Sequence, residues 1–150
     1  MKEQGFTLIE LMVVLVIIGI ASAAISLTIK PDPLQLLRKD ADRLSQLLQV
    51  AQAEARADGR PITLRTDAKG FRFTRRTDDG VGLEAFKGDN PLRPRPWEST
   101  PMQIDIEPRQ TLVLNAEWIN PPLRVVLSDG QHRLSLQRDA AGLMRVVSQP

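Results

Sequence analysis

One carboxylate stands alone in an apolar segment, and it is the residue of this chain best placed to do chemistry. Glu10 is the only ionisable side chain between Phe6 and Ile29. A carboxylate inside an apolar helix costs about 2.5–3.5 kcal/mol near the middle of a bilayer and less near an interface. Such a group usually has a partner, so we expect Glu10 to pair with a positive charge. A tolerated glutamate in a simple membrane anchor is the alternative interpretation.

The segment that carries Glu10 is predicted to be a helix. Leu, Ile, Val and Ala supply nearly all of it, and Lys30 with Pro31 marks its end. Its length is about that needed to cross a bilayer, so we expect a transmembrane helix over residues 6–30. A secretory signal peptide cleaved near Ala21-Ser22-Ala23 is the competing interpretation, but it leaves Glu10 unexplained. The leader has only Lys2 as a basic side chain, which gives modest support to a cytoplasmic N-terminus.

The order of the first ten residues resembles the class III signal of type IV pilins and type II secretion pseudopilins. In those families a prepilin peptidase cuts after the glycine and methylates the new N-terminal residue. The resemblance implies a leader over residues 1–5, cleavage after Gly5 and N-methylation of Phe6. The new α-amine of Phe6 can be positively charged at neutral pH, and Glu10 of a neighbouring subunit can pair with it. That pairing would fix the axial register between subunits.

Composition gives no support for an enzyme. The formal charge of +2 does not by itself indicate nucleic-acid binding, and the absence of cysteine excludes disulfide and thiol chemistry. His132 is the only histidine and lies in a predicted strand, so a surface histidine is favoured over a catalytic one or a zinc ligand. Asp78, Asp79 and Asp89 lack the spacing of a calcium-binding loop and are interpreted as solvated loop carboxylates. We therefore expect no catalytic residue, no metal site and no cofactor.

The residues after the apolar segment predict one compact head over residues 31–150, of class α+β. Pro31-Asp32-Pro33 interrupts the first helix, and a second, amphipathic helix is expected over about 34–58. The spacing of its apolar residues favours packing on a sheet over a coiled-coil seam; these are Leu37, Ala41, Leu44, Leu48, Ala51 and Ala55. The pattern then changes to alternation, and 61–150 is expected to be β-rich.

Stretches of alternating apolar and polar residues define the strands of the predicted head. Ile62 to Phe73 reads as a hairpin around the turn Asp67-Ala68-Lys69-Gly70, and 81–101 reads as a long loop rich in Gly and Pro. Two strand faces follow around Ile104 and Leu112. The end of the chain, from Leu123 to Val146, predicts three short strands joined by tight turns, which is an antiparallel meander.

The layout of the head resembles that of the H-type (GspH-like) minor pseudopilins of type II secretion and of FimT- and FimU-like minor pilins. The similarity rests on Ala51 to Arg60 with the helix-ending segment Ala55 to Pro61, on Phe71-Arg72-Phe73 and on Leu92 to Pro96. It implies a long N-terminal helix that continues into the amphipathic helix, which packs on an antiparallel β-sandwich-like head. Leu27 stands where many major pilins carry a proline, and the cysteine pair of many pilins is absent.

The same resemblance implies a structural role in a short periplasmic filament. The protein would be a single-pass inner-membrane protein with its head in the periplasm, near the tip of the pseudopilus. Its expected partners are the major pseudopilin, the I-, J- and K-type minor pseudopilins, the prepilin peptidase, the inner-membrane assembly platform and membrane lipid. A type IV pilus minor pilin that assists pilus assembly or captures DNA is the alternative.

The long predicted loop contains the first candidate for a contact with another subunit. Arg93, Arg95 and Trp97 lie close together in it. Tryptophan in such a loop is more often a packing anchor, but Trp97 beside Arg95 also fits a protein contact. The acidic residues between the arginines of the head favour a mixed, solvated surface over a nucleic-acid site, and the chain ends with one arginine, Arg145, near its C-terminus.

Overall fold

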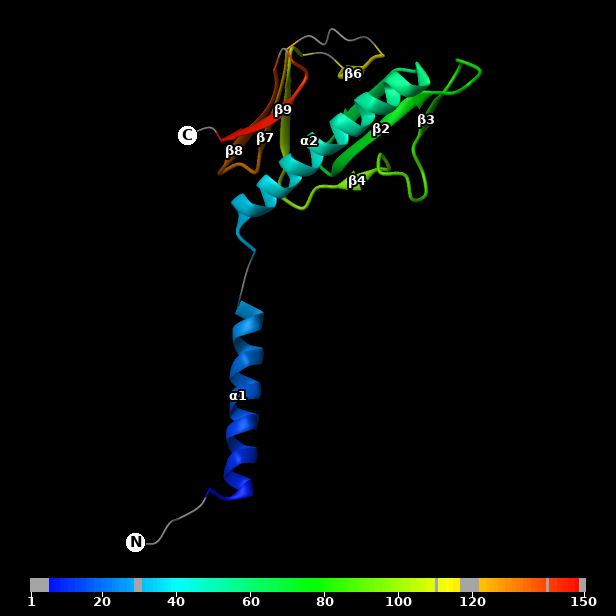
Figure 1. The fold of residues 1–150 in the computed structure, drawn as a ribbon. Coiled ribbons are helices and arrows are strands. Elements are labelled where there is room, and N and C mark those ends of the chain that lie inside the picture. The colour runs from blue at the N-terminus through cyan, green and yellow to red at the C-terminus, as the bar shows by residue number, and fades with distance from the viewer. Residues whose placement is uncertain (1–5, 29–30, 110, 117–121, 140, 149–150) are drawn as a thin grey trace. The chain divides into compact units, whose positions relative to one another are not determined.

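The computed structural model describes residues 6–28, 31–109, 111–116, 122–139 and 141–148, and the chain forms two compact units, Met1–Asp32 and Pro33–Pro150. The first unit holds α1 (Leu8–Thr28) (Figure 1). Its large apolar side chains from Leu8 to Ile20 are exposed, from 43% at Val14 to 78% at Leu8. Within the described part of the chain, no helix combines the length and the apolarity that crossing a membrane requires. The transmembrane assignment therefore stays a prediction. The expected continuation of the first helix into the second is not found at Pro31 and Asp32, which lie outside both helices, and residues 29–30 are outside the described residues.

The second unit begins with α2 (Pro33–Asp58), close to the predicted range of 34–58. Pro33 occupies the first turn, where a missing N–H costs nothing. The helix ends before Gly59, whose φ of +66° is the left-handed conformation that commonly ends a helix and that favours glycine. All six residues of the predicted apolar stripe are buried, which confirms packing on a sheet; Leu47, Ser45 and Asp40 are buried beside them.

A five-stranded sheet follows α2, counted over the described residues. Its strands are β1 (Ile62–Thr66), β2 (Gly70–Arg76), β3 (Leu83–Ala85), β4 (Arg95–Pro96) and β6 (Val113–Leu114). The order is β3-β2-β1-β6, and β4 also pairs with β2. The predicted hairpin is confirmed, because Leu64 pairs with Phe73 and the turn lies at Asp67 to Gly70. Two short strands, β3 and β4, lie in the region predicted as a long loop.

The rest of the head forms a four-stranded antiparallel sheet within the described residues. Its strands are β5 (Gln103–Glu107), β7 (Leu123–Ser128), β8 (Arg133–Arg138) and β9 (Met144–Ser148), in the order β5-β7-β8-β9. The predicted meander is thus confirmed as β7-β8-β9. The placement of His132 in a strand was wrong, because it lies in the turn before β8. There the carboxylate of Asp129 accepts its backbone N–H at 2.6 Å.

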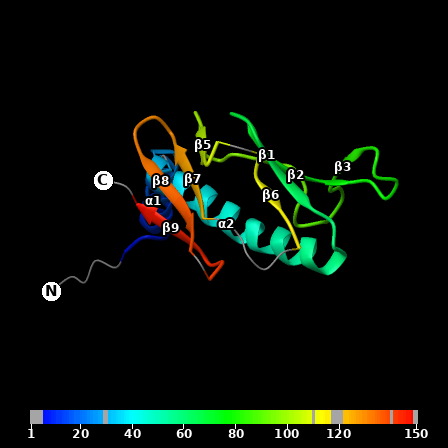
Figure 2. The ribbon, with the colours of Figure 1, turned by 90° about the horizontal axis from the view of Figure 1, so that it is seen from above.

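One hydrophobic core joins the two sheets and the helix. Figures 1 and 2 show α2 running past strands of both sheets, and its buried face shares a single cluster with residues of each. Phe73 and Ile62 enter this cluster from the five-stranded sheet, and Val125 and Leu136 enter it from the four-stranded sheet. The outcome is the predicted α+β head with two antiparallel sheets. The helix α2 packs against both sheets, which share no strand.

Candidate functional site

The N-terminal segment presents a carboxylate at a helix start. The hydroxyl and the carbonyl of Thr7 both accept the N–H of Glu10, at 3.3 and 3.1 Å, so Thr7 caps α1. Thr7-Leu8-Ile9-Glu10 has the spacing of a capping box, a signal that the sequence analysis missed. Glu10 also lies in the first turn, where negative charge is favourable.

The carboxylate of Glu10 is available for an external partner. Glu10 is exposed, and its side chain makes no hydrogen bond or ion pair with any residue in the described part of the chain. Phe6 precedes the helix and is also exposed. The predicted cleavage position, Gly5, lies outside the described residues. The cap and the favourable position of Glu10 in the first turn account for the helix start, while its carboxylate has no side-chain partner among the described residues.

The loop predicted to contact a partner is divided between surface and core. Arg93 is exposed, and Arg95 is half-buried in β4. Trp97 is only 5% exposed; its Nε1–H donates to the carbonyl of Asp67 at 2.8 Å, and its ring lies 4.7 Å from that of Phe71. In this conformation Trp97 anchors the loop and presents no contact surface. A contact through the two arginines stays a prediction.

A buried carboxylate holds the end of that loop against α2. Asp40 is fully buried and accepts the N–H of Glu98 at 3.0 and 3.2 Å and that of Ser99 at 2.8 Å. Burial raises the pKa of Asp40, and the two backbone N–H groups oppose that rise. Nothing in the helical pattern predicted this role, because a single Asp on the apolar stripe has no sequence signature.

Two cations of α2 reinforce the same junction. Lys39 Nζ lies 2.8 Å from Glu98, and Arg43 donates to the other carboxylate oxygen of that residue. Hydrogen bonds from Lys39 and Arg43 lower the pKa of Glu98. Together with Asp40, they fix residues 98–99 on the helix. The loop that carries Arg93 and Arg95 is therefore held at its C-terminal end.

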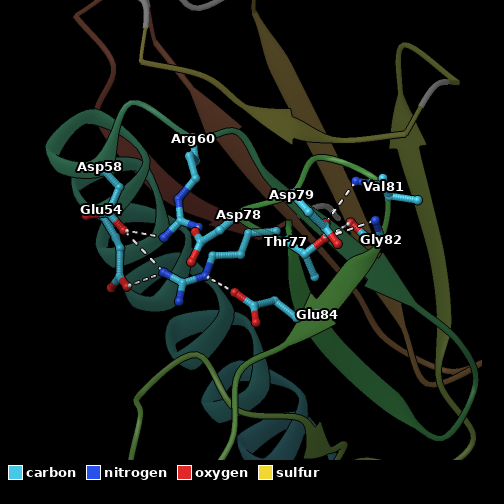
Figure 3. A network of polar contacts seen from close by, with 10 residues as sticks. Glu54, Asp58, Arg60, Thr77, Asp78, Asp79, Val81, Gly82 and Glu84 are labelled. Carbon is cyan, nitrogen blue, oxygen red and sulfur yellow. Dashed lines mark hydrogen bonds and ion pairs between the residues drawn. The ribbon is translucent and has the colours of Figure 1, made fainter.

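A second charged cluster joins the far end of α2 to the five-stranded sheet (Figure 3). Arg75 of β2 donates from Nε to Glu84 at 2.7 Å and from Nη1 to Asp58 at 3.2 Å, and Glu54 lies 3.9 Å away. Its guanidinium also sits 5.1 Å from the ring centre of Phe86. The hydrogen bond to Glu84 is the main reason that the pKa of Arg75 is raised. These contacts link the end of α2 to β2 and β3.

The described residues offer no obvious place for a metal. Within them, no group of three or more His, Asp or Glu side chains is arranged to hold an ion. His132 Nδ1 lies 3.0 Å from Asp129, whose carboxylate also accepts the backbone N–H of Gln131. This arrangement closes the β7–β8 turn and gives the histidine a structural role.

Comparison with known proteins places the chain in a family. The model of the prokaryotic N-terminal methylation motif matches residues 1–26, and that of the type II transport protein GspH matches residues 40–142. The chain belongs to the GspH family. Type II secretion system protein H of Aeromonas hydrophila is 32% identical over 94 residues, which are 61% of this chain and 50% of that protein. The chain thus spans about half the length of this curated relative.

Two solved structures share the fold of this GspH-family chain. The minor pseudopilin EpsH from the type 2 secretion system of Vibrio cholerae has a TM-score of 0.59 and 17% identity, over 75% of this chain and 96% of that one. The type IV minor pilin FimU of Pseudomonas aeruginosa has a TM-score of 0.51 and 19% identity, over 76% and 88%. Both likenesses support the pilin-like α+β fold, and the match to FimU is the weaker one.

Proposed function

We propose that this protein is a minor pseudopilin of a type II secretion system, a structural subunit that supports protein export across the outer membrane. The observation that carries the proposal is the GspH family match over residues 40–142 in the same chain as the methylation motif over residues 1–26. The exposed apolar surface of α1 agrees with a segment that packs against lipid or against other subunits.

The first step of this proposal is processing at the N-terminus. A prepilin peptidase removes residues 1–5 by cutting after Gly5 and then methylates the amine of Phe6. Intact-mass analysis of the mature chain should show the loss of Met1 to Gly5 and the gain of one methyl group. Replacing Gly5 by a bulky residue should block cleavage. A mature chain that begins near Ala24 would instead show ordinary signal-peptidase cleavage and would refute this step.

The second step is assembly through Glu10. Its exposed carboxylate has no partner among the described residues, which agrees with pairing to the amine of Phe6 on a neighbouring subunit. Glu10→Leu should leave membrane insertion and cleavage intact and reduce crosslinking of the processed chain into filaments. Ser22→Leu adds apolar surface to the same helix and retains the carboxylate, so it is the matched control. Thr7→Ala removes the hydroxyl that caps α1 and retains the carboxylate of Glu10, so it distinguishes the effect of the cap from that of the charge.

The location and partners follow from the same proposal. The apolar segment over residues 6–30 anchors the chain once in the inner membrane, with the head in the periplasm near the tip of the pseudopilus. Neighbouring subunits are the major pseudopilin and the I-, J- and K-type minor pseudopilins, delivered by the inner-membrane assembly platform. Membrane anchoring raises the effective concentration of the heads, so weak contacts between them are sufficient.

A minor pilin of a type IV pilus is the second candidate. The likeness to FimU favours it, although that likeness shows the fold alone. The two candidates differ in which process fails when the gene is removed, export or pilus formation. DNA capture would in addition require duplex binding that weakens steeply as salt rises.

A further inference from the structure

A basic groove lies on the head beside the β1–β2 turn. Its volume is about 280 Å³, and it is lined by the ends of β1 and β2, the turn between them and β4. We define the basic groove by its four cationic lining residues, Arg65, Lys69, Arg72 and Arg95. Pro94 and Pro96 supply apolar lining. All residues that line the groove belong to the head, Pro33–Pro150.

Among the described residues, no carboxylate forms an ion pair with a cation of the basic groove, and Arg95 donates from Nη2 to the carbonyl of Pro91 at 3.4 Å. The side chains of Arg65, Lys69 and Arg72 make no hydrogen bond or ion pair with any residue that the structure describes. Arg65 lies directly opposite Arg72 in the β1–β2 register, an arrangement of like charges that destabilises a sheet. Arg75, three residues further along β2, is instead surrounded by carboxylates. The contrast shows that the groove holds four cations beside a single lining carboxylate, Asp67, whereas Arg75 alone has three carboxylates around it.

The one carboxylate at the groove is already engaged by backbone groups. Asp67 Oδ1 accepts the N–H of Lys69 at 2.8 Å and that of Gly70 at 3.0 Å, which closes the turn. These two hydrogen bonds are the main reason that the pKa of Asp67 is lowered, and the charge of Arg72 adds less. The Nε atom of Arg95 is buried and has no hydrogen-bond partner. The donors of the basic groove therefore remain in excess over its acceptors.

The frame of the basic groove is held in place before any ligand binds. β2 and β4 approach so closely that a Cβ on Gly70 would lie 2.3 Å from the carbonyl oxygen of Arg95, so only glycine fits there. Trp97 locks the same corner, because its backbone N–H donates to the carbonyl of Lys69 at 3.1 Å and its indole to that of Asp67. A preorganised site loses less entropy on binding.

We propose that the basic groove receives an acidic segment of a neighbouring protein, with glutamate or aspartate side chains pairing with Arg65 and Arg72. The inference rests on the proposed function, which supplies neighbours held at high local concentration. Arginine pairs well with carboxylates because its planar fork donates two parallel hydrogen bonds. The proline-lined wall gives the aliphatic parts of such a segment an apolar contact.

A protein segment fits this site better than nucleic acid does. A specific DNA interface buries at least about 600 Å² of protein and follows a line of phosphates. The basic groove is small, and two exposed acidic residues, Asp78 and Asp79, lie in the turn that follows β2. Asp78 is paired with Arg60, but Asp79 has no ion pair among the described residues and would repel an extended phosphate backbone, whereas a short acidic segment can avoid it.

The test measures binding of a labelled peptide of alternating glutamate and alanine to the full chain in detergent micelles. Arg72→Glu replaces a like-charge pair with an opposite-charge pair across the strands, so the variant should fold at least as well as the wild type. It should bind the peptide about tenfold more weakly, because attraction becomes repulsion. Arg76→Glu, an equal charge change at an exposed position of the same strand, should leave binding near the wild-type value. Raising the salt concentration should weaken wild-type binding.

Three results would overturn the inference. They are equal peptide binding by Arg72→Glu and Arg76→Glu, equal binding of a lysine–alanine peptide, and tighter binding of a short DNA duplex than of the acidic peptide at the same salt. Cleavage after Gly5 and filament crosslinking are measured on the same variants. If these persist while peptide binding is absent, the groove inference falls and the proposed function stands. If cleavage and crosslinking fail in the wild type, the proposed function falls independently.

Discussion

Removing the carboxylate of Asp40 should loosen the loop that it holds. Asp40 is fully buried on α2 and is the acceptor for the backbone N–H groups of Glu98 and Ser99. In Asp40→Ala both N–H groups lose their acceptor inside the protein. The change also removes a buried charge, whose burial is unfavourable enough to raise the pKa of Asp40. The two effects oppose each other, so their magnitudes decide the outcome.

The loss of hydrogen bonds should dominate. Each buried N–H group left without a partner costs about 1–3 kcal/mol, so two groups cost about 2–6 kcal/mol. Relief of the buried charge offsets part of this, and we expect a net loss of about 2–4 kcal/mol. That is a large share of the roughly 5–15 kcal/mol that stabilises a typical domain. Asp40→Asn retains one acceptor oxygen and should lose less than Asp40→Ala.

Denaturant unfolding and amide hydrogen exchange measure the two parts of this prediction. Asp42→Ala is the control, because Asp42 is exposed on the same helix and should change stability by no more than about 0.5 kcal/mol. The amides of Glu98 and Ser99 should exchange faster in Asp40→Ala than in Asp42→Ala. Equal stability and equal exchange in these two variants would refute the reasoning.

Three further predictions concern the rest of the head. Leu44→Ala should cost about 2–5 kcal/mol in denaturant unfolding, because Leu44 is fully buried in the core between α2 and the sheets; a loss below about 1 kcal/mol would contradict that packing. Arg75→Ala should cost about 1–2 kcal/mol and Arg76→Ala less than about 0.5 kcal/mol, and equal losses would mean that the contacts of Arg75 contribute nothing. Burial would raise the pKa of Asp129, but hydrogen bonds from His132 and a neighbouring amide lower it overall. The folded pKa lies below the unfolded one, so this stabilisation is present above the ordinary carboxyl range and is lost as the pH falls below it. Unfolding followed from neutral to acid pH should show a smaller acid loss in Asp129→Asn, and parallel curves would contradict the assignment.

Local sequence patterns predicted most of the fold. The apolar stripe of Leu37 to Ala55 gave α2, and alternating residues gave the β1–β2 hairpin and the β7–β8–β9 meander. These elements depend on residues close in sequence, so their periodicity is visible without a structure. The short strands β3 and β4 were missed because tertiary pairing with β2, and not local propensity, makes them.

The contacts that shape the surface could not be predicted in the same way. Asp40 binds amides 58 and 59 residues further along the chain, and the indole of Trp97 reaches back 30 residues to Asp67. Such pairings depend on how the chain after β4 packs against α2 and the β1–β2 turn. The prediction that His132 lies in a strand was wrong for a local reason. Asp129 accepts the backbone N–H of His132 in a turn, so β8 begins only at Arg133. The capping box at Thr7 and Glu10, by contrast, was readable from spacing alone.

The proposed role in secretion is tested most directly by deleting the gene in a host that carries both a type II secretion system and type IV pili. Export of a secreted enzyme and the presence of surface pili are measured in the same cells, with the wild-type gene restored as the control. The account predicts loss of export, with pili retained, and recovery of export when the gene is restored. Normal export together with loss of pili would contradict the account and favour the minor pilin.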